Sequence, residues 1–557
     1  MSFSGTSNPP NDSLQNLGPI QAQNDASFHA PADSLPPSIP GSHVSQPETL
    51  TTFIGRSHYI TPDIHIDEAS ARAYPHLKND GLSEASIKTL ELWGSFNLPQ
   101  RATSQSLFDA YMDKCYPWAP VIRPEDLANF DQPNFSLLLK QAIFVAGSRV
   151  TSGPGVIAYA STSEFYQRAK ALFWQTHEND PLTVITSCVL LQWYNPDGPE
   201  HVTFDGSGFW LQIAVGLSRQ VGLHKETAKT GDSVIRRRLW WTLVVRDCLL
   251  SVGQGRPRAL SLKDSDVKPL RFEDFPESNH LAELFIPYVD ICMLLASLTE
   301  SCSRKHLSHE ARLYLEASLF KWSRTLPGSL RTCQETSNGG SESAPYNFNA
   351  RQLHLPFFTT IAMLSRAKSD QQAPSPATIL ASSFVVGIFE DILARDEQKF
   401  LPSIFTFYVL AAGVALVPLR QYPPLWIAAQ QDLEILQTAL DQLGQRWPSA
   451  RGAKIALQNV IRQTASSTKS SVVEQLVWLD REECLLFEGF PTTLCRLWQP
   501  LESLILKVPP TSESPPPIVQ NGSPETSSAP DHIMQTTFYD PIVEGLESLQ
   551  YDGIGNW

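Results

Sequence analysis

The apolar residues of this chain recur at helical spacing over most of its length. From about Leu92 to Leu506 they repeat every three to four residues, as in FSLLLKQAIFVAGS (Phe135–Ser148). This spacing places them on one face of an α-helix. We find no sustained alternation of apolar and polar residues and no turn signals between alternating runs, which would mark strands and hairpins. The pattern predicts an all-α fold built from many helices.

Capping residues stand where this pattern expects helices to begin and end. Ser161 and Glu164 are in capping-box register ahead of an apolar run. Asp180 precedes Pro181, as an N-cap precedes a proline at the first helical position. Gly222 follows a helical segment and can adopt the left-handed conformation that ends a helix. The first two pairs therefore indicate helix starts, and Gly222 indicates a helix end.

Composition divides the chain into six segments. The first fifty residues or so are rich in Pro, Ser, Asn and Gln and lack Lys and Arg before Arg56, so they cannot bury enough apolar surface to fold. A break rich in Gly and Ser, Thr336–Pro345, separates two helical parts. The predicted divisions are a disordered N-terminus (1–50), a short leading segment (51–91), a helical core (92–335), a linker (336–352), a second helical part (353–507) and a disordered acidic and aromatic tail (508–557).

The tail combines carboxylates with bulky apolar side chains and has no Lys or Arg after Lys507. This mixture, clearest in Asp531–Trp557, is typical of disordered transcriptional activation segments, in which apolar groups stay hydrated until they dock on a coactivator. An ordinary frayed C-terminus has a similar composition and stays open as the alternative. The candidate activation residues are Phe538, Tyr539, Asp540, Glu544, Leu546, Tyr551 and Trp557.

The net charge and the cysteines restrict the kinds of site to expect. A formal net charge of -14 repels phosphate backbones, so nucleic-acid binding would need a local basic patch. The eight cysteines form no CxxC pair, which argues against a disulfide scaffold or a structural zinc site and favours reduced, buried thiols. The uncharged segment Leu401–Leu419 is barely long enough to span a bilayer, and its polar residues and two prolines favour a buried helix.

No catalytic constellation stands out. Ser218 follows Gly216 as in a nucleophile elbow, but Gln220 replaces the second glycine and the serine lies in a helical pattern. The glycines of TSGPGV lack the Gly-Lys-Ser/Thr of a phosphate loop, and we expect them in a loop between helices. His177, His201 and His224 stand alone. We therefore expect a protein that is not an enzyme, with a membrane-associated enzyme as the weakest alternative.

The stretch RRRLWWTLVVRDCLLSVGQGRPRAL (Arg236–Leu260) combines charge with an apolar run. As a helix it is apolar around most of its circumference, which predicts burial. Arg246 and Asp247 then lie in or beside a core, so each is expected to have a hydrogen-bonded partner. Gly253 and Gly255 should end the helix. The leading arginines are expected to meet acidic partners more than phosphates.

Four segments in this order resemble the regulatory domain of fungal zinc-cluster transcription factors, the middle homology region. They are LFDAYMDKCYPWAPVI (Leu107–Ile122), DPLTVITSCVLLQWY (Asp180–Tyr194), GFWLQIAVGLSRQVGLHK (Gly208–Lys225) and RRRLWWTLVVRDCLLSVGQGRP (Arg236–Pro257). The resemblance covers roughly Leu107 to Leu270, and FIGRSHYI (Phe53–Ile60) resembles a short element ahead of this domain in cutinase-activator-type members. The signature residues, to which we assign a structural role, are Arg237, Arg238, Trp240, Trp241, Arg246, Asp247, Gly255, Arg256 and Pro257.

The resemblance implies an α-helical regulatory domain, a nuclear location and control of a metabolic gene set, with secondary metabolism as one option. It also implies a DNA-binding cluster of six cysteines and two zinc ions, but the first cysteine here is Cys115, so no zinc ligand or DNA-binding residue can be assigned and no cofactor is expected. DNA contact would then come from a homo- or heterodimeric partner with a zinc cluster, or from an N-terminal cluster missing from this chain. A coactivator and a small-molecule inducer are the other expected partners. We expect no association with a membrane. The alternative is a ligand-sensing or repressor-type module without activation function.

Overall fold

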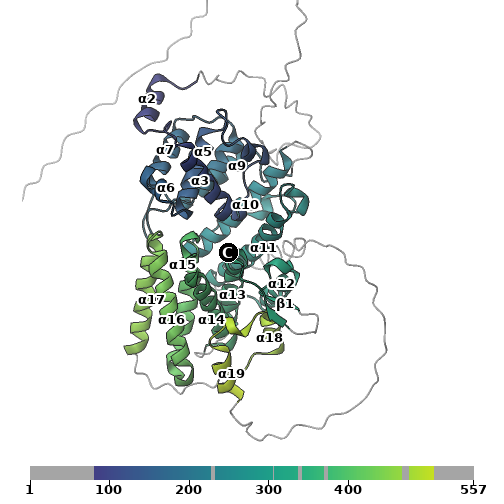
Figure 1. Ribbon diagram of the computed structural model, residues 1–557. Coiled ribbons are helices and arrows are strands. Elements are labelled where there is room, and N and C mark those ends of the chain that lie inside the picture. Colours follow the sequence, from purple (N-terminus) through teal and green to yellow (C-terminus); the bar gives the residue numbers. More distant parts are fainter. Residues whose placement is uncertain are drawn as a thin grey trace, which may run out of the picture. The chain divides into compact units, whose positions relative to one another are not determined.

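The computed structural model describes residues 81–226, 232–304, 307–335, 341–368, 374–466 and 476–506, all within one compact unit. The regular secondary structure of these residues is almost entirely helical, which confirms the predicted all-α class (Figure 1). The exception among them is one pair of short antiparallel strands, β1 (Cys333–Glu335) and β2 (Ser341–Ser343), in which Gln334 lies opposite Glu342.

The N-terminal set of helices is arranged around α5. The set consists of α2 (Glu84–Leu92), α3 (Arg101–Lys114), α4 (Pro124–Ala128), α5 (Leu137–Val150), α6 (Pro154–Tyr159), α7 (Thr162–Trp174), α8 (Pro181–Leu191) and α9 (Ser207–Gln220). Helix α5 packs against α3, α7 and α8. A glycine allows α3 and α5 to approach closely, since a Cβ on Gly147 would lie 2.2 Å from the carbonyl oxygen of Leu107.

The predicted caps are present at the ends of these helices. Ser161 and Glu164 form a complete capping box at α7, and the Asp180 carboxylate accepts the Thr183 N–H at the start of α8. Gly222, with a φ of 67°, follows α9, and the next N–H, from Leu223, donates to the carbonyl of Ser218 at 2.8 Å. This pattern satisfies carbonyls that the helix end would otherwise leave unpaired.

Three longer helices connect the N-terminal set to the rest of the molecule. They are α10 (Ser233–Gln254), α11 (Asn279–Ser303) and α12 (His309–Thr325). Helix α10 packs against α8, α9 and α11, while α11 also packs against α13 of the following set. Figure 1 accordingly shows α10 and α11 between the N-terminal and C-terminal helices.

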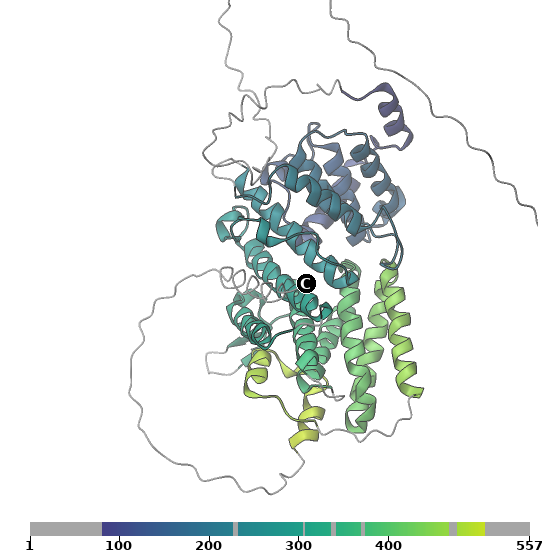
Figure 2. The same ribbon diagram turned by 180° about the vertical axis from the view of Figure 1, so that it is seen from behind.

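The C-terminal set surrounds α14, which packs against α13, α15 and α16. The set comprises α13 (Phe348–Lys368), α14 (Pro376–Ala394), α15 (Phe405–Leu416), α16 (Pro423–Leu443), α17 (Pro448–Ser466), α18 (Arg481–Phe487) and α19 (Trp498–Leu506). Helices α15, α16 and α17 lie side by side in both views (Figures 1 and 2). Short 3-10 helices occupy Tyr116–Trp118, Leu262–Asp264, Phe272–Asp274, Gly328–Leu330, Gln398–Phe400, Val417–Gln421 and Thr492–Leu494.

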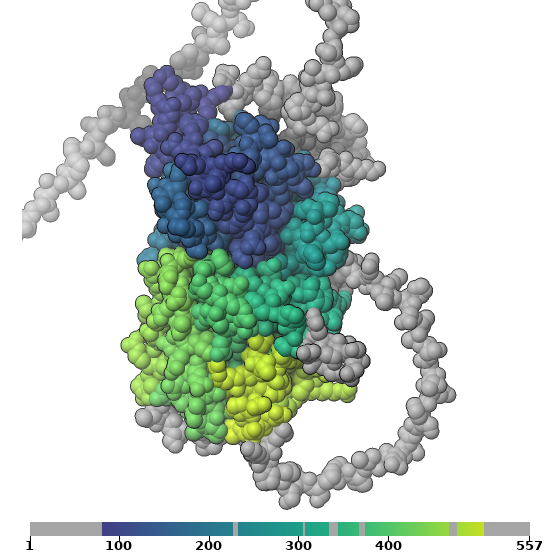
Figure 3. All heavy atoms as spheres, viewed as in Figure 1, coloured from purple at the N-terminus to yellow at the C-terminus, as the bar shows by residue number. Residues whose placement is uncertain are grey.

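The two helical sets share one core. A single cluster of buried apolar side chains extends from Leu90 to Leu501, and Figure 3 shows the N-terminal and C-terminal sets in direct contact. The boundaries differ in detail from the composition-based divisions. Helix α2 begins inside the predicted leading segment (51–91), while β2 and the start of α13 fall inside the predicted linker (336–352). The segments predicted as disordered, 1–50 and 508–557, lie outside the described residues.

Among the helices of the described residues, α11 and α14 are long and apolar enough to cross a membrane, but 78% and 72% of their apolar windows are buried inside the fold. The segment Leu401–Leu419, predicted as a buried helix, forms α15 and most of the following 3-10 turn. Phe405, Val409 and Leu416 of α15 are buried in the common core.

Candidate functional site

The signature arginine Arg238 is fully buried in α10 and is completely occupied by protein groups. Its Nε donates to the carbonyl of Pro120 at 2.7 Å, its Nη1 to Glu277 at 2.6 Å and its Nη2 to the hydroxyl of Tyr116 at 2.7 Å. A guanidinium held in this way ties α10 to the turn after α3 and to the segment before α11. Arg238 therefore has a structural role and cannot reach a phosphate.

The two preceding arginines also bond inside the protein. Arg237 forms ion pairs with Glu226 and Asp274, and Arg236 donates to the carbonyl of Val221 at 2.6 Å. The acidic partners expected for this run are thus present at Arg237. The basic start of α10 holds neighbouring segments and does not form a free basic patch.

The tryptophans of the signature are core residues. Trp240 and Trp241 are each 1% exposed. The indole Nε1 of Trp241 donates to the carbonyl of Lys268 at 2.9 Å, while Nε1 of Trp240 is buried without a hydrogen-bond partner among the described residues. Trp240 therefore contributes through apolar packing alone, and Trp241 also fixes the chain that returns along α10.

Asp247 holds the turn that follows α10. Its carboxylate accepts hydrogen bonds from Arg258 Nε at 3.1 Å and from the N–H groups of Ala259 at 2.8 Å and Leu260 at 3.1 Å. The helix ends at Gly255, which has a φ of 62°, whereas Gly253, also expected at the end, lies inside the helix. Asp247 and the turn at Gly255 thus act together to change the direction of the chain after α10.

The other two signature residues of this turn, Arg256 and Pro257, are exposed. Arg256 donates to the carbonyl of Pro199 and to the side chain of Gln254, both at 3.0 Å. These bonds hold the loop between α8 and α9 against the end of α10.

Arg246 and Asp247 do not pair with each other. Arg246 donates from Nε to the side-chain oxygen of Gln192, the C-cap residue of α8, at 3.0 Å. Its expected partner on another helix exists, but the partner is a neutral amide. Arg246 also borders a cavity, which the sequence analysis did not predict.

This cavity has a volume of about 870 Å³. Four parts of the chain form its walls: the end of α8 with the following loop (192–206) and the start of α9, the second half of α10, the start of α15 (402–410) and the start of α17. Its apolar lining includes Trp193, Phe209, Leu211, Leu249, Phe407, Leu410 and Trp447. A mainly apolar cavity of this size with a few polar groups is typical of a small-molecule site.

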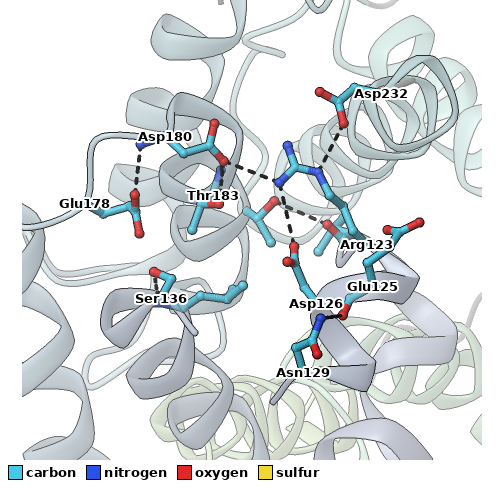
Figure 4. Close-up of polar contacts among 12 residues, drawn as sticks. Arg123, Glu125, Asp126, Asn129, Ser136, Glu178, Asp180, Thr183 and Asp232 are labelled. Carbon is cyan, nitrogen blue, oxygen red and sulfur yellow. Dashed lines mark hydrogen bonds and ion pairs between the residues drawn. The ribbon is translucent and has the colours of Figure 1, made fainter. Parts of the chain in front are cut away.

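A polar cluster connects the starts of α4, α8 and α10. Arg123 lies between the carboxylates of Asp126 (3.7 Å), Asp180 (3.6 Å) and Asp232 (3.3 Å), as Figure 4 shows. Burial raises the pKa of Asp126, and the Arg123 charge opposes that shift. The cluster holds three helix starts together and contains one cation for three carboxylates.

The other motifs considered in the sequence analysis are parts of the fold. Ser218 is buried in α9 and donates to the carbonyl of Val215, and the glycine segment expected as a loop partly forms α6. All eight cysteines are free thiols, five of them buried. In the part of the chain that the structure covers, no group of three or more His, Cys, Asp or Glu residues could hold a metal ion. The candidate activation residues between Phe538 and Trp557 lie outside the described residues.

Comparisons with known proteins agree with this arrangement. Residues 108–307 match the fungal-specific transcription factor domain. The chain is 26% identical over 442 residues to cutinase transcription factor 1 alpha of Fusarium vanettenii, covering 71% of this chain and 48% of that protein. It is 28% identical over 385 residues to the acetamidase regulatory protein of Aspergillus oryzae, covering 64% and 48%. No solved structure matches.

Over residues 108–307 the chain is similar to the fungal transcription factors that carry this domain. It spans about half the length of the relatives described above. The matched span contains α10 and its signature but ends before α15 and α17, so part of the cavity wall lies outside it.

Proposed function

We propose that this protein is a nuclear regulator of transcription that controls a metabolic gene set and is not an enzyme. The observation that carries the proposal is the domain match over residues 108–307, a span in which the signature segments fold around α10. The names of the relatives, a cutinase transcription factor and an acetamidase regulatory protein, support a metabolic set of targets. Secondary metabolism is one such set.

DNA contact, in this proposal, comes from a zinc-cluster protein that pairs with this chain, or from a zinc cluster attached to it in a longer form. Two observations support an outside source. The net charge of -14 opposes binding to phosphates, and Arg237 and Arg238 are engaged within the fold. No cofactor is assigned to the described part of the chain.

We further propose that the acidic tail recruits a coactivator. The test is a reporter assay in which the chain is tethered to DNA through a heterologous DNA-binding domain. Deletion of residues 531–557 should abolish activation, because it removes the apolar and acidic groups that would dock. Deletion of an equal number of residues from the N-terminus is the matched control and should leave activation intact.

The reporter also separates the alternatives. Activation that survives loss of the tail would place the activating function elsewhere, and repression by the tethered chain would favour the repressor-type module. In the fungus, deletion of the gene should change transcript levels of a defined metabolic set, and chromatin immunoprecipitation of the tagged protein should recover the promoters of those genes. A protein absent from every promoter would contradict the proposed function.

The cavity supports a sensing role within the same function. A regulator of metabolic genes needs a signal, and the cavity beside α10 has the size and lining of a small-molecule site. We propose that it receives a small-molecule inducer.

A further inference from the structure

Arg246 lacks an acidic partner although it is half-buried in α10. Its guanidinium donates to the neutral side chain of Gln192, and no Asp or Glu in the described part of the chain forms an ion pair with it. Burial lowers the pKa of its guanidinium, and the groups that oppose this shift are Tyr288, Cys115 and Cys292. A buried cation without a counterion is unfavourable, so an anion beside it would be stabilising.

The acidic neighbour in the sequence does not fill this need. The Asp247 carboxylate is occupied by Arg258 and by two backbone N–H groups beyond Gly255. Two buried arginines differ from Arg246 in this respect, because Arg238 pairs with Glu277 and Arg351 pairs with Asp391. A third, Arg236, is held by the carbonyl of Val221. Arg246 keeps partial exposure because its side chain borders the cavity.

Two further cavity-lining residues carry unsatisfied polar atoms. Nε2 of Gln192 and Oγ1 of Thr406 are buried without a hydrogen-bond partner among the described residues. Buried polar atoms usually have partners, and exceptions need a cause. Gln192 is the C-cap of α8 and Thr406 lies in α15, so unsatisfied polar groups stand on two sides of the cavity that Arg246 borders.

The loop that borders the cavity indicates what else an occupant would contain. Val202 is 93% exposed and Phe204 is 72% exposed, so bulky apolar groups stand uncovered at the cavity. Asp197 and Glu200 of the same loop are exposed carboxylates. A second arginine, Arg256, also lines the cavity, but it is exposed and donates to the Pro199 carbonyl and the Gln254 side chain. Apolar walls with one half-buried arginine that has no acidic partner favour an apolar body with one anionic group, and the two carboxylates disfavour ligands with several negative charges.

We propose that this cavity binds a small monocarboxylate with an apolar body, whose carboxylate is held by Arg246. That such binding would control transcription rests on the proposed function. A planar guanidinium can donate two parallel hydrogen bonds to a carboxylate, and its remaining nitrogens are free for this geometry once Nε is bound to Gln192. The apolar body lies against Trp193 and Trp447, and it contacts both helical sets at once.

Binding is tested on the purified full chain with 11-(dansylamino)undecanoic acid and its methyl ester. Trp193 and Trp447 line the cavity, so energy transfer from tryptophan to the dansyl group reports occupancy. The acid should bind at least about tenfold more tightly than the ester, because a hydrogen bond to a charged group contributes about 1.5–3 kcal/mol. In Arg246→Gln the affinity for the acid should fall to that for the ester, and the affinity for the ester should not change.

Arg101→Gln is the matched control, because Arg101 is exposed at the start of α3, away from the cavity. It should bind both probes as the parent does. Equal binding of acid and ester by the parent would overturn the proposal, even if Arg246→Gln failed to fold. Loss of acid binding in Arg101→Gln would also overturn it, because the effect would then be one of general charge.

The reporter assay distinguishes failure of the inference from failure of the proposed function. Selective acid binding by a chain that occupies no promoter would leave the ligand class standing and remove the regulatory function. A working regulator that does not discriminate acid from ester would keep its function and lose this ligand class.

Discussion

Arg238 and Arg246 lie on the same helix about two turns apart, yet replacing each by methionine should change the free energy of unfolding by very different amounts. Methionine keeps an unbranched apolar side chain and removes the charge and all donors. Arg238→Met leaves the Glu277 carboxylate, the Tyr116 hydroxyl and the Pro120 carbonyl without their donor. Removing one partner of a buried ion pair costs about 3–5 kcal/mol.

The lower end of that range applies here. The Glu277 side chain is 20% exposed and can recover some hydration, so we expect a loss of about 3 kcal/mol in the free energy of unfolding. In Arg246→Met, the loss is one hydrogen bond to the Gln192 amide, about 1 kcal/mol. Removal of an unpaired buried cation offsets that loss, so the net change should stay within about 1 kcal/mol of zero.

Urea unfolding of the full chain, followed by tryptophan fluorescence, measures both variants against the parent. The buried tryptophans Trp210, Trp240, Trp241 and Trp322 report loss of the core. The comparison is valid where the three slopes against urea agree. A loss in Arg246→Met as large as that in Arg238→Met would refute the assignment of Arg246 to a ligand, because it would reveal a structural partner.

Substitutions at three further positions test the packing and the buried charge. Trp241→Ala should lower the free energy of unfolding by about 3–5 kcal/mol, and Trp241→Phe, which loses the bond to Lys268, by less; urea unfolding compares them. Burial raises the pKa of Asp290 to about 7, so ionisation weakens the fold as pH rises from 3.8 through 7. Asp290→Asn should therefore stabilise the protein by up to about 4 kcal/mol at pH 8 and change its stability little at pH 3. Free energies of unfolding of parent and variant that differ by the same amount at every pH in this range would contradict this prediction. Gly387→Ala should be strongly destabilising in a thermal melt, because its Cβ would lie 1.9 Å from the Leu494 carbonyl oxygen.

Local physics made the helices predictable from the sequence. The caps at Ser161 and Asp180 and the left-handed Gly222 depend on a few neighbouring residues, and each occurs as expected. The burial of Trp240 and Trp241 followed from the apolar circumference of their helix. Gly253 was misplaced because either glycine can end a helix, and the positive φ falls on Gly255.

The candidate site was less accessible to sequence reasoning, because its walls come from segments about 200 residues apart. The need of Arg246 for a partner followed from its place in an apolar run, but Gln192 and Thr406 carried no signal in their own segments. The spacing of apolar residues gives the buried face of each helix and not the helix against which it packs. The two short strands were missed because β1 and β2 have only three residues each, too few for an alternating pattern.

The position of the cavity connects the domain match to a mechanism of control. The matched span, 108–307, supplies α10 and the wall that bears Arg246, while α15 and the start of α17 supply the opposite wall. Trp447 of that second wall donates from Nε1 to the carbonyl of Leu401 and stacks against Arg149 of α5, so it already joins the two helical sets. An occupant held by Arg246 and packed on Trp447 would bind the assembled arrangement better than any arrangement in which the sets separate. Such a differential affinity is the physical requirement for a ligand to shift a conformational equilibrium.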